Sequence, residues 1–216
     1  MDKNKFKKAL EEIKKNSPKR KFIQSYDLIF GLQNLDLKKP EQQLDVYVTM
    51  QFPRGKKVKI CAFVGPELLD EATKVCDLAI LVDDFPKYEQ KKLAKKLAGS
   101  FDFFIAQANI MAKVASSFGR ILGPRNKMPN PKAGCVVPPK VQLKPLYDKL
   151  QKTVRVSART ALMSQCAVGN EEMKDEEVLD NIMNIYNQVV HTLPGHENNI
   201  RAIYLKMTMG KPVRVV

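Results

Sequence analysis

The residues best suited to binding chemistry lie in a proline- and glycine-rich basic loop at positions 121–134. Its glycines, prolines and cations include Gly123, Pro124, Arg125, Lys127, Pro129, Lys132 and Gly134. Proline restricts the backbone and glycine permits tight turns, so a loop of this composition is expected to hold one shape. Its cations would then lie at fixed positions. An ordinary surface loop is the alternative interpretation.

A second candidate segment, residues 206–211, ends a predicted strand near the C-terminus. Lys206 supplies a cation, Thr208 a hydroxyl group and Met209 a flexible apolar surface that can lie against a ribose or a base. Gly210 permits the close approach of another backbone. Taken alone, the segment is more typical of a strand that simply ends at a glycine.

A third candidate segment, residues 19–27, leads from three consecutive cations into an aromatic strand. Lys21 and its neighbours could contact phosphate groups, and Phe22 could stack on a base of structured RNA. Phe22 could equally belong to the hydrophobic core.

The motifs that would support catalysis are missing from the chain. It has neither a G-x-G-x-x-G turn nor a G-x-x-x-x-G-K-[ST] loop, and the first strand–helix turn of its α/β part offers only Gly65 followed by Pro66. The four cysteines form no C-x-x-C pair, which indicates core residues rather than a zinc site. We therefore expect no enzyme activity, no cofactor and no metal ion.

The net charge indicates a polyanionic partner. The 37 basic and 23 acidic residues give a formal charge of +14. Residues 1–60 carry 15 Lys or Arg against 7 Asp or Glu, residues 61–152 carry 15 against 9, and residues 153–216 carry 7 of each. An excess spread over the first two thirds of the chain favours nucleic acid as the partner.

Hydrophobic periodicity predicts helices and strands in both halves of the chain. Residues 3–15 have the apolar spacing of an amphipathic helix, with Phe6, Ala9, Leu10 and Ile13 on one face. Residues 22–32 and 200–209 are predicted strands. Between the two, short strands alternate with helices from residue 60 onward, which is typical of a parallel sheet covered by helices.

This pattern predicts an α/β protein of two domains. A split α+β domain is formed by residues 1–60 and 153–216, and a Rossmann-like α/β domain is inserted at residues 61–152. No apolar stretch approaches the ~20 residues that a membrane helix needs. The N-terminal residues also lack the apolar core of a secretory signal. We therefore expect a cytosolic protein with no membrane partner.

Four segments, taken in order, resemble the universal stalk protein family of the large ribosomal subunit, counted as protein number one of that subunit. Residues 122–125 and 129–134 match the family's signature loop, and Thr208-Met209-Gly210 matches its C-terminal motif. Residues 103–109 and Gln24-Ser25 are similar to its archaeal branch. The resemblance runs over essentially the whole chain.

The resemblance implies a structural component of the ribosome, monomeric when off it, that binds ribosomal RNA of the mobile stalk near the exit site. Further implied roles are assistance in releasing deacylated tRNA from the exit site and repression of the translation of the protein's own messenger RNA. The split domain would bind the RNA. The RNA-binding residues implied by the matched motifs are Lys21, Phe22, Ser25, Asp27, Gly169, Lys206, Thr208, Met209 and Gly210.

Three positions depart from the family pattern. Asn126 stands where the family commonly has glycine, although asparagine tolerates a left-handed backbone. The turn at residues 52–56 is shorter than the usual version, which bears on the connection between the domains. Lys174 replaces a usual Ser or Thr before the late helix, and we expect a cap weaker by about 1 kcal/mol unless Asp175 takes over.

Overall fold

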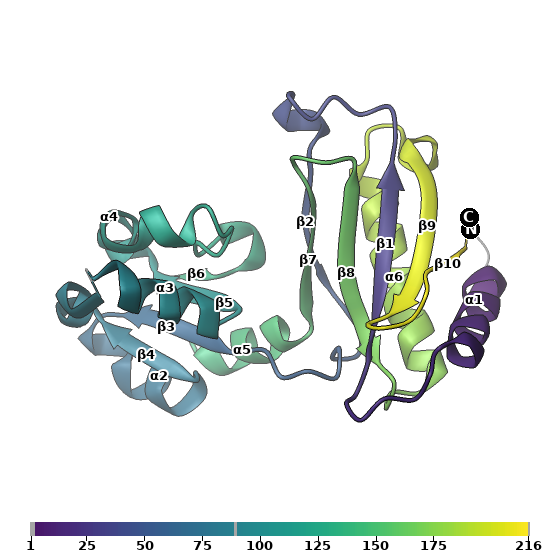
Figure 1. Cartoon of the computed structure of the whole chain (residues 1–216). Coiled ribbons are helices and arrows are strands. Elements are labelled where there is room, and N and C mark those ends of the chain that lie inside the picture. Colours follow the sequence, from purple (N-terminus) through teal and green to yellow (C-terminus); the bar gives the residue numbers. More distant parts are fainter. Residues whose placement is uncertain (1–2, 89, 216) are drawn as a thin grey trace. The chain divides into compact units, whose positions relative to one another are not determined.

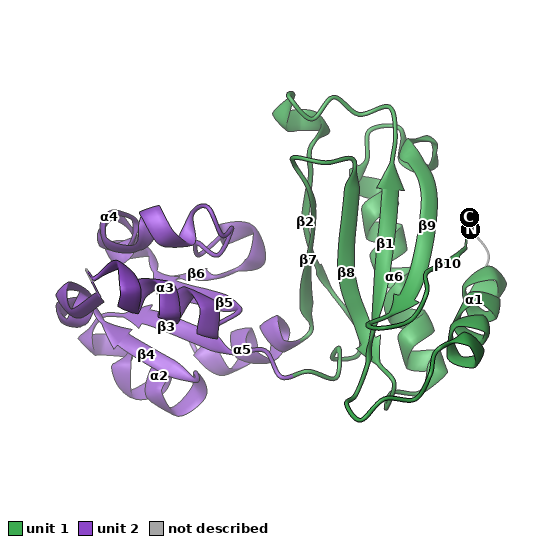
Figure 2. Ribbon diagram, in the orientation of Figure 1, with its two compact units in different colours: residues 1–56, 152–216 green, residues 57–151 purple. Residues whose placement is uncertain are grey.

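The computed structural model of the protein describes residues 3–88 and 90–215. The chain forms two compact units (Figure 2). Unit 1 consists of Met1–Lys56 and Lys152–Val216, and unit 2 of Lys57–Gln151. The chain therefore passes between the units at 56/57 and 151/152, slightly earlier than the sequence predicts. Helices and sheets occur in both units, which confirms the predicted α/β fold class.

Unit 1 is built on antiparallel strands (Figure 1). Four of them form a sheet in the order β10-β9-β1-β8, and β2 pairs with β7. These strands are β1 (Ser25–Leu32), β2 (Leu44–Thr49), β7 (Thr153–Ala158), β8 (Met163–Asn170), β9 (Ile200–Met207) and β10 (Val213–Arg214). The first strand thus begins three residues later than predicted and β9 ends two residues earlier, so the candidate residues Phe22, Thr208 and Met209 lie outside the strands.

Two helices, α1 (Lys3–Asn16) and α6 (Asp175–Thr192), close the core of unit 1. The four apolar residues predicted for the inner face of α1 are all buried. Burial alternates along β1, where Tyr26 and Leu28 face the core while Asp27 and Ile29 remain partly exposed on the other face. The sheet therefore has one face covered by helices and one that is open. Figure 1 shows α6 running behind the strands.

Unit 2 has a parallel sheet in the order β4-β3-β5-β6 with helices packed against it. Its strands are β3 (Ile60–Val64), β4 (Leu78–Leu81), β5 (Phe103–Gln107) and β6 (Val136–Val137), and its helices α2 (Leu69–Val75), α3 (Lys91–Ser100), α4 (Met111–Leu122) and α5 (Leu143–Gln151). All five residues of β3 are buried, as expected for a central parallel strand. Phe63 packs against Phe85, Phe104 and Phe118 in an aromatic core.

Short 3-10 segments precede three of these helices and three of the strands. Those before helices are Pro66–Leu68, Val82–Tyr88 and Ala108–Ile110, and those before strands are Pro40–Gln42, Pro131–Ala133 and His196–Asn199. The four cysteines are free thiols and all are buried, which confirms the expectation that they fill the core.

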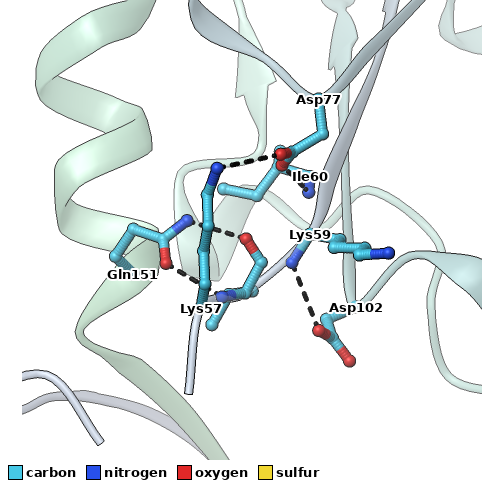
Figure 3. A network of polar contacts seen from close by, with 7 residues as sticks. Lys57, Lys59, Ile60, Asp77, Asp102 and Gln151 are labelled. Carbon is cyan, nitrogen blue, oxygen red and sulfur yellow. Dashed lines mark hydrogen bonds and ion pairs between the residues drawn. The ribbon is translucent and has the colours of Figure 1, made fainter. Parts of the chain in front are cut away.

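Amide side chains hold the chain on either side of the first connection. In unit 2, the Gln151 side chain accepts a hydrogen bond from the Val58 N–H at 2.9 Å and donates one to the Val58 carbonyl at 2.8 Å (Figure 3). Asp77 accepts from the Ile60 N–H at 2.9 Å beside this pair. In unit 1, Asn181 accepts from the Phe52 N–H and donates to the Phe52 carbonyl, both at 3.1 Å. Each unit therefore fixes its own end of the connection.

The turn at residues 52–56 depends on a glycine. Gly55 has φ +81°, and a Cβ atom there would collide with the side chain of Asn170. Glycine is thus required both by the backbone conformation and by the close approach of Asn170.

Asn181 is fully buried and also donates to the Val168 carbonyl at 3.0 Å. We predict that Asn181→Leu, which keeps the volume but leaves buried backbone groups unpaired, destabilises the protein by about 2–3 kcal/mol. The measurement is the midpoint of urea unfolding followed by circular dichroism. Asn187→Leu on the exposed face of the same helix is the matched control. Equal midpoints for the two variants would contradict the assigned role.

Candidate nucleic-acid interface

Antiparallel pairing brings the beginning of β1 next to the end of β9. Tyr26 lies opposite Met207 in the register of these strands. The segment before β1, with Phe22, and the segment after β9, with Met209, therefore lie together although most of the chain separates them. Two of the three segments singled out in the sequence meet at this end of unit 1.

The Thr208 side chain extends this pairing beyond the strands. Its Oγ1 accepts a hydrogen bond from the Ser25 N–H at 3.0 Å, and its own N–H donates to the Ser25 carbonyl at 3.1 Å. The hydroxyl is also placed to donate to that carbonyl, at 3.4 Å. Thr208 thus positions the two chain ends, and part of its hydrogen-bonding capacity is already in use within the protein.

Gln24 is the central side chain that sequence reasoning did not select as a site residue. It is 1% exposed, accepts from the Met209 N–H at 3.3 Å and donates to the Pro18 carbonyl at 3.3 Å. Its main-chain N–H donates to Glu171 Oε1 at 3.0 Å, and its carbonyl accepts from the Glu171 N–H at 3.0 Å. One buried amide therefore joins three loops. The sequence feature that could have pointed to Gln24 is its position as a polar residue among apolar and aromatic neighbours.

Large apolar side chains protrude around this buried amide. Phe22 is 49% exposed, Ile23 53% and Met209 58%. Phe22 is therefore not a core residue, which resolves the alternative left by the sequence. Lys21, next to it, is exposed as well. Exposed apolar groups beside cations form a surface that can both stack on bases and contact phosphates.

Asp27 and Lys206 lie opposite each other on the open face of the sheet. Burial raises the pKa of the Asp27 carboxyl, and the Lys206 ammonium opposes that rise. Gly169 does not join them, because it is buried and a Cβ atom there would meet Met173 Sδ at 3.0 Å, on the core side. Gly210 does belong to the site, where its missing side chain leaves room for the Ser17 hydroxyl.

The third segment, the loop at 121–134, lies in unit 2 and directs two of its cations at helix α3. Arg125 donates to the Lys95 carbonyl at 3.1 Å, and Lys127 Nζ donates to the Ala98 and Phe101 carbonyls at 2.9 and 2.6 Å. Helix α3 has no basic residue in its last turn, so Lys127 supplies donors to the carbonyls at its C-terminal end, while Arg125 contacts a carbonyl farther inside the helix. Burial lowers the pKa of Lys127, and the nearby Asp102 carboxylate opposes this change.

The backbone of this loop contains the left-handed residues and the short helix that its composition favours. Asn126 has φ +56° and Gly134 φ +77°, so asparagine does adopt the left-handed conformation expected of it. The Asn130 side chain caps the short helix Pro131–Ala133 by accepting from the Lys132 N–H at 2.9 Å. Lys132 is exposed and Pro129 buried, and Gly123 and Pro124 are exposed at the end of α4.

The Lys174 side chain makes no capping hydrogen bond at the start of α6, because its ammonium group cannot accept one. Glu177, not Asp175, accepts a hydrogen bond from the Lys174 N–H, at 3.3 Å. Asp175 forms an ion pair with Lys14 of α1 instead.

Neither a metal site nor a membrane helix is found in the described part of the chain. No three His, Cys, Asp or Glu side chains of residues 3–88 and 90–215 gather in a way that could hold a metal ion. Over the same residues, no helix combines the length and apolar character needed to span a bilayer.

Comparison with known proteins gives matches over the whole length of the chain. The model of the ribosomal protein L1p/L10e family matches residues 11–211. A Nanoarchaeum equitans protein named large ribosomal subunit protein uL1 is 39% identical over 214 residues, which cover 96% of this chain and 99% of that protein. Proteins of the same name from Methanobrevibacter smithii and Thermoplasma acidophilum are 40% and 37% identical, covering 96% and 100% of this chain and 97% of each relative.

The contacts of Lys127 predict a structural role for this residue. Lys127→Met keeps much of the aliphatic stem but removes both charge-assisted hydrogen bonds, and we expect it to destabilise unit 2 by about 1–2 kcal/mol. Lys132→Met, at an exposed position of the same loop, is the control and should leave the urea midpoint unchanged. A Lys127→Met protein as stable as the wild type would show that these bonds contribute nothing.

Proposed function

The chain belongs to the ribosomal protein L1p/L10e family, and from this premise we propose that it binds the stalk RNA of the large ribosomal subunit near the exit site. The relatives are named as large-subunit ribosomal proteins, which confirms the prediction that the chain is not an enzyme. Binding to ribosomal RNA is general for this family. The proposal therefore concerns which RNA is bound, by which residues, and with what further effects.

The observation that carries the proposal is the cluster of exposed apolar side chains at the end of unit 1. We define the RNA surface as Lys21, Phe22, Ser25, Asp27, Lys206, Thr208, Met209 and Gly210. The fold of unit 1 leaves about half of each of the Phe22 and Met209 side chains exposed, and a free nucleic-acid base or ribose is a suitable partner for both. Gly169 is left out of this surface because it faces the core.

The surface combines cations with groups that can recognise bases and ribose, so it suits structured RNA better than a polyanion bound through charge alone. Lys21 and Lys206 can contact phosphates and fix the position of the RNA backbone. The Ser25 hydroxyl and the hydrogen-bonding capacity that Thr208 and the Ser25 carbonyl retain can serve ribose 2′-OH groups, which distinguish RNA from DNA. The hydrogen bonds of Gln24 and Thr208 hold the chain segments beneath this surface in place, so the protein needs little ordering when it binds RNA.

The other roles follow from the same surface and from the charge of unit 2. A leader segment of the protein's own messenger RNA with a similar fold would occupy the same RNA surface, so that repression of translation would compete with ribosome binding. Exit-site tRNA, in contrast, would be contacted by unit 2, where α3 carries Lys91, Lys92, Lys95 and Lys96 and no acidic residue. We propose that the protein acts in the cytoplasm, on the ribosome, and is a monomer when off it.

The order of the two RNA affinities is the first test. Binding of the purified protein to a stalk fragment of large-subunit ribosomal RNA and to its own leader messenger RNA should be measured at one fixed salt concentration. We expect tighter binding to the ribosomal fragment. Equal or tighter binding to the leader would reverse this order and make the messenger the primary target.

The RNA surface is tested by Thr208→Val, which keeps the shape of the side chain but removes the bond to the Ser25 N–H. We expect RNA affinity to fall by about tenfold, because Phe22 and Met209 lose their fixed separation and a hydroxyl is lost. Thr208→Ser should retain most of the affinity. Thr160→Val, at an exposed turn between β7 and β8, is the control. Wild-type affinity in Thr208→Val would refute the site.

A further inference from the structure

Beside the RNA surface, unit 1 has an open hollow of about 350 Å³. This volume is at the lower end of the range for small-molecule sites. Its walls include apolar groups and hydrogen-bonding groups from α1, from the loop before β1, and from both β1 and β9. The lining residues used in the argument are Ser17, Pro18, Lys19, Tyr26, Glu171 and Met207.

Two hydroxyl groups of this hollow are buried without a hydrogen-bond partner among the described residues, namely Ser17 Oγ and Tyr26 OH. Tyr26 is only 1% exposed. A buried hydroxyl without a partner is costly, and the buried polar groups of native proteins are nearly always paired with protein, water or a bound ligand. Two of them in one hollow indicate a place built for a polar ligand.

The hydroxyl of Tyr26 is a stable hydrogen-bond donor. Burial, followed by the nearby carboxylates of Asp175 and Glu171, raises the pKa of Tyr26 to about 12. Its proton is therefore retained at every physiological pH. Glu171 offers carboxylate oxygens on the same side, one of which already accepts from the Gln24 N–H. Lys19 is exposed and places a cation at the edge of the hollow.

The hollow is structurally continuous with the RNA surface. Gln24 lines it and at the same time accepts the Met209 N–H. Met207 lines it and is followed directly by Thr208. The Ser17 hydroxyl approaches Gly210 so closely that a side chain at residue 210 would displace it. An RNA chain lying on Phe22 and Met209 would therefore pass the mouth of the hollow.

We propose that this hollow accepts one unstacked nucleotide of the bound RNA, an inference that rests on the proposed function. The base lies against Pro18, Tyr26 and Met207, and the hydroxyls of Ser17 and Tyr26 bond to its polar edge. Lys19 contacts the adjoining phosphate. A free phosphate ion could pair with Lys14 and Lys19 at the hollow but would leave its apolar wall unused. Unstacking is least costly for a base that is already unpaired, so the nucleotide comes from a loop or a bulge.

The test uses Tyr26→Phe, which removes only the unpartnered hydroxyl. We expect RNA affinity to fall by about five- to tenfold, while the midpoint of urea unfolding stays the same or rises because a buried unpaired group is gone. A hydroxyl with a purely structural role would show the opposite pattern, with lower stability and unchanged affinity. Ser17→Ala is the second variant, and Tyr47→Phe on β2, outside the hollow, is the control.

The nucleotide is identified by a scan of the stalk RNA fragment with single abasic positions, each measured with wild-type and Tyr26→Phe protein. One position should weaken wild-type binding and have little further effect on the variant. If the wild type binds the fragment but no abasic position is coupled to Tyr26, the nucleotide site is refuted and the proposed function stands. If the wild type does not bind the fragment, both proposals fail together.

Discussion

The candidate site depends on the antiparallel pairing of the first strand of unit 1 with its last long strand. This ladder places Tyr26 opposite Met207 and is continued past the strand ends by the two bonds between Ser25 and Thr208. Gln24 then ties the emerging segments to each other and to Glu171 from beneath. Without this pairing, the residues that protrude on the surface would belong to two unrelated chain ends.

Polar and apolar residues have opposite roles at this end of the molecule. The side chains of Gln24 and Thr208 form hydrogen bonds with backbone groups of the protein. From the sequence, Thr208 is expected to contact the ligand, and Gln24 is not selected. The apolar side chains of Phe22 and Met209, which would normally be buried, are exposed. Because the hydrogen bonds lie within the protein, the surface is rigid before a partner arrives, and binding costs less conformational entropy. The net positive charge of unit 1 lies in its N-terminal segment, whereas residues 153–216 carry equal numbers of basic and acidic residues.

Local features of the structure were predictable from the sequence, whereas long-range partners were not. The inner face of α1, the alternation of strands and helices in unit 2 and the left-handed Asn126 follow from periodicity and backbone preference, which act over a few residues. The bond from the Met209 N–H to Gln24 joins residues 185 positions apart, and no local pattern encodes it. The inward direction of Gly169 likewise depends on a register irregularity beside Tyr26, where Tyr26 pairs with Gly169 and Asp27 with Ala167.

The loop at 121–134 shows that a family-specific motif need not be a contact surface. Its composition suggested cations held out on a stiff loop, but Arg125 and Lys127 are directed at carbonyls of α3 and its C-terminal end. A helix end without a basic residue needs donors from elsewhere, and this loop supplies them. The positions of Arg125 and Lys127 in the loop are therefore accounted for by contacts within unit 2. Among the cations of the loop, only Lys132 has a side chain that these contacts do not involve, and it is exposed.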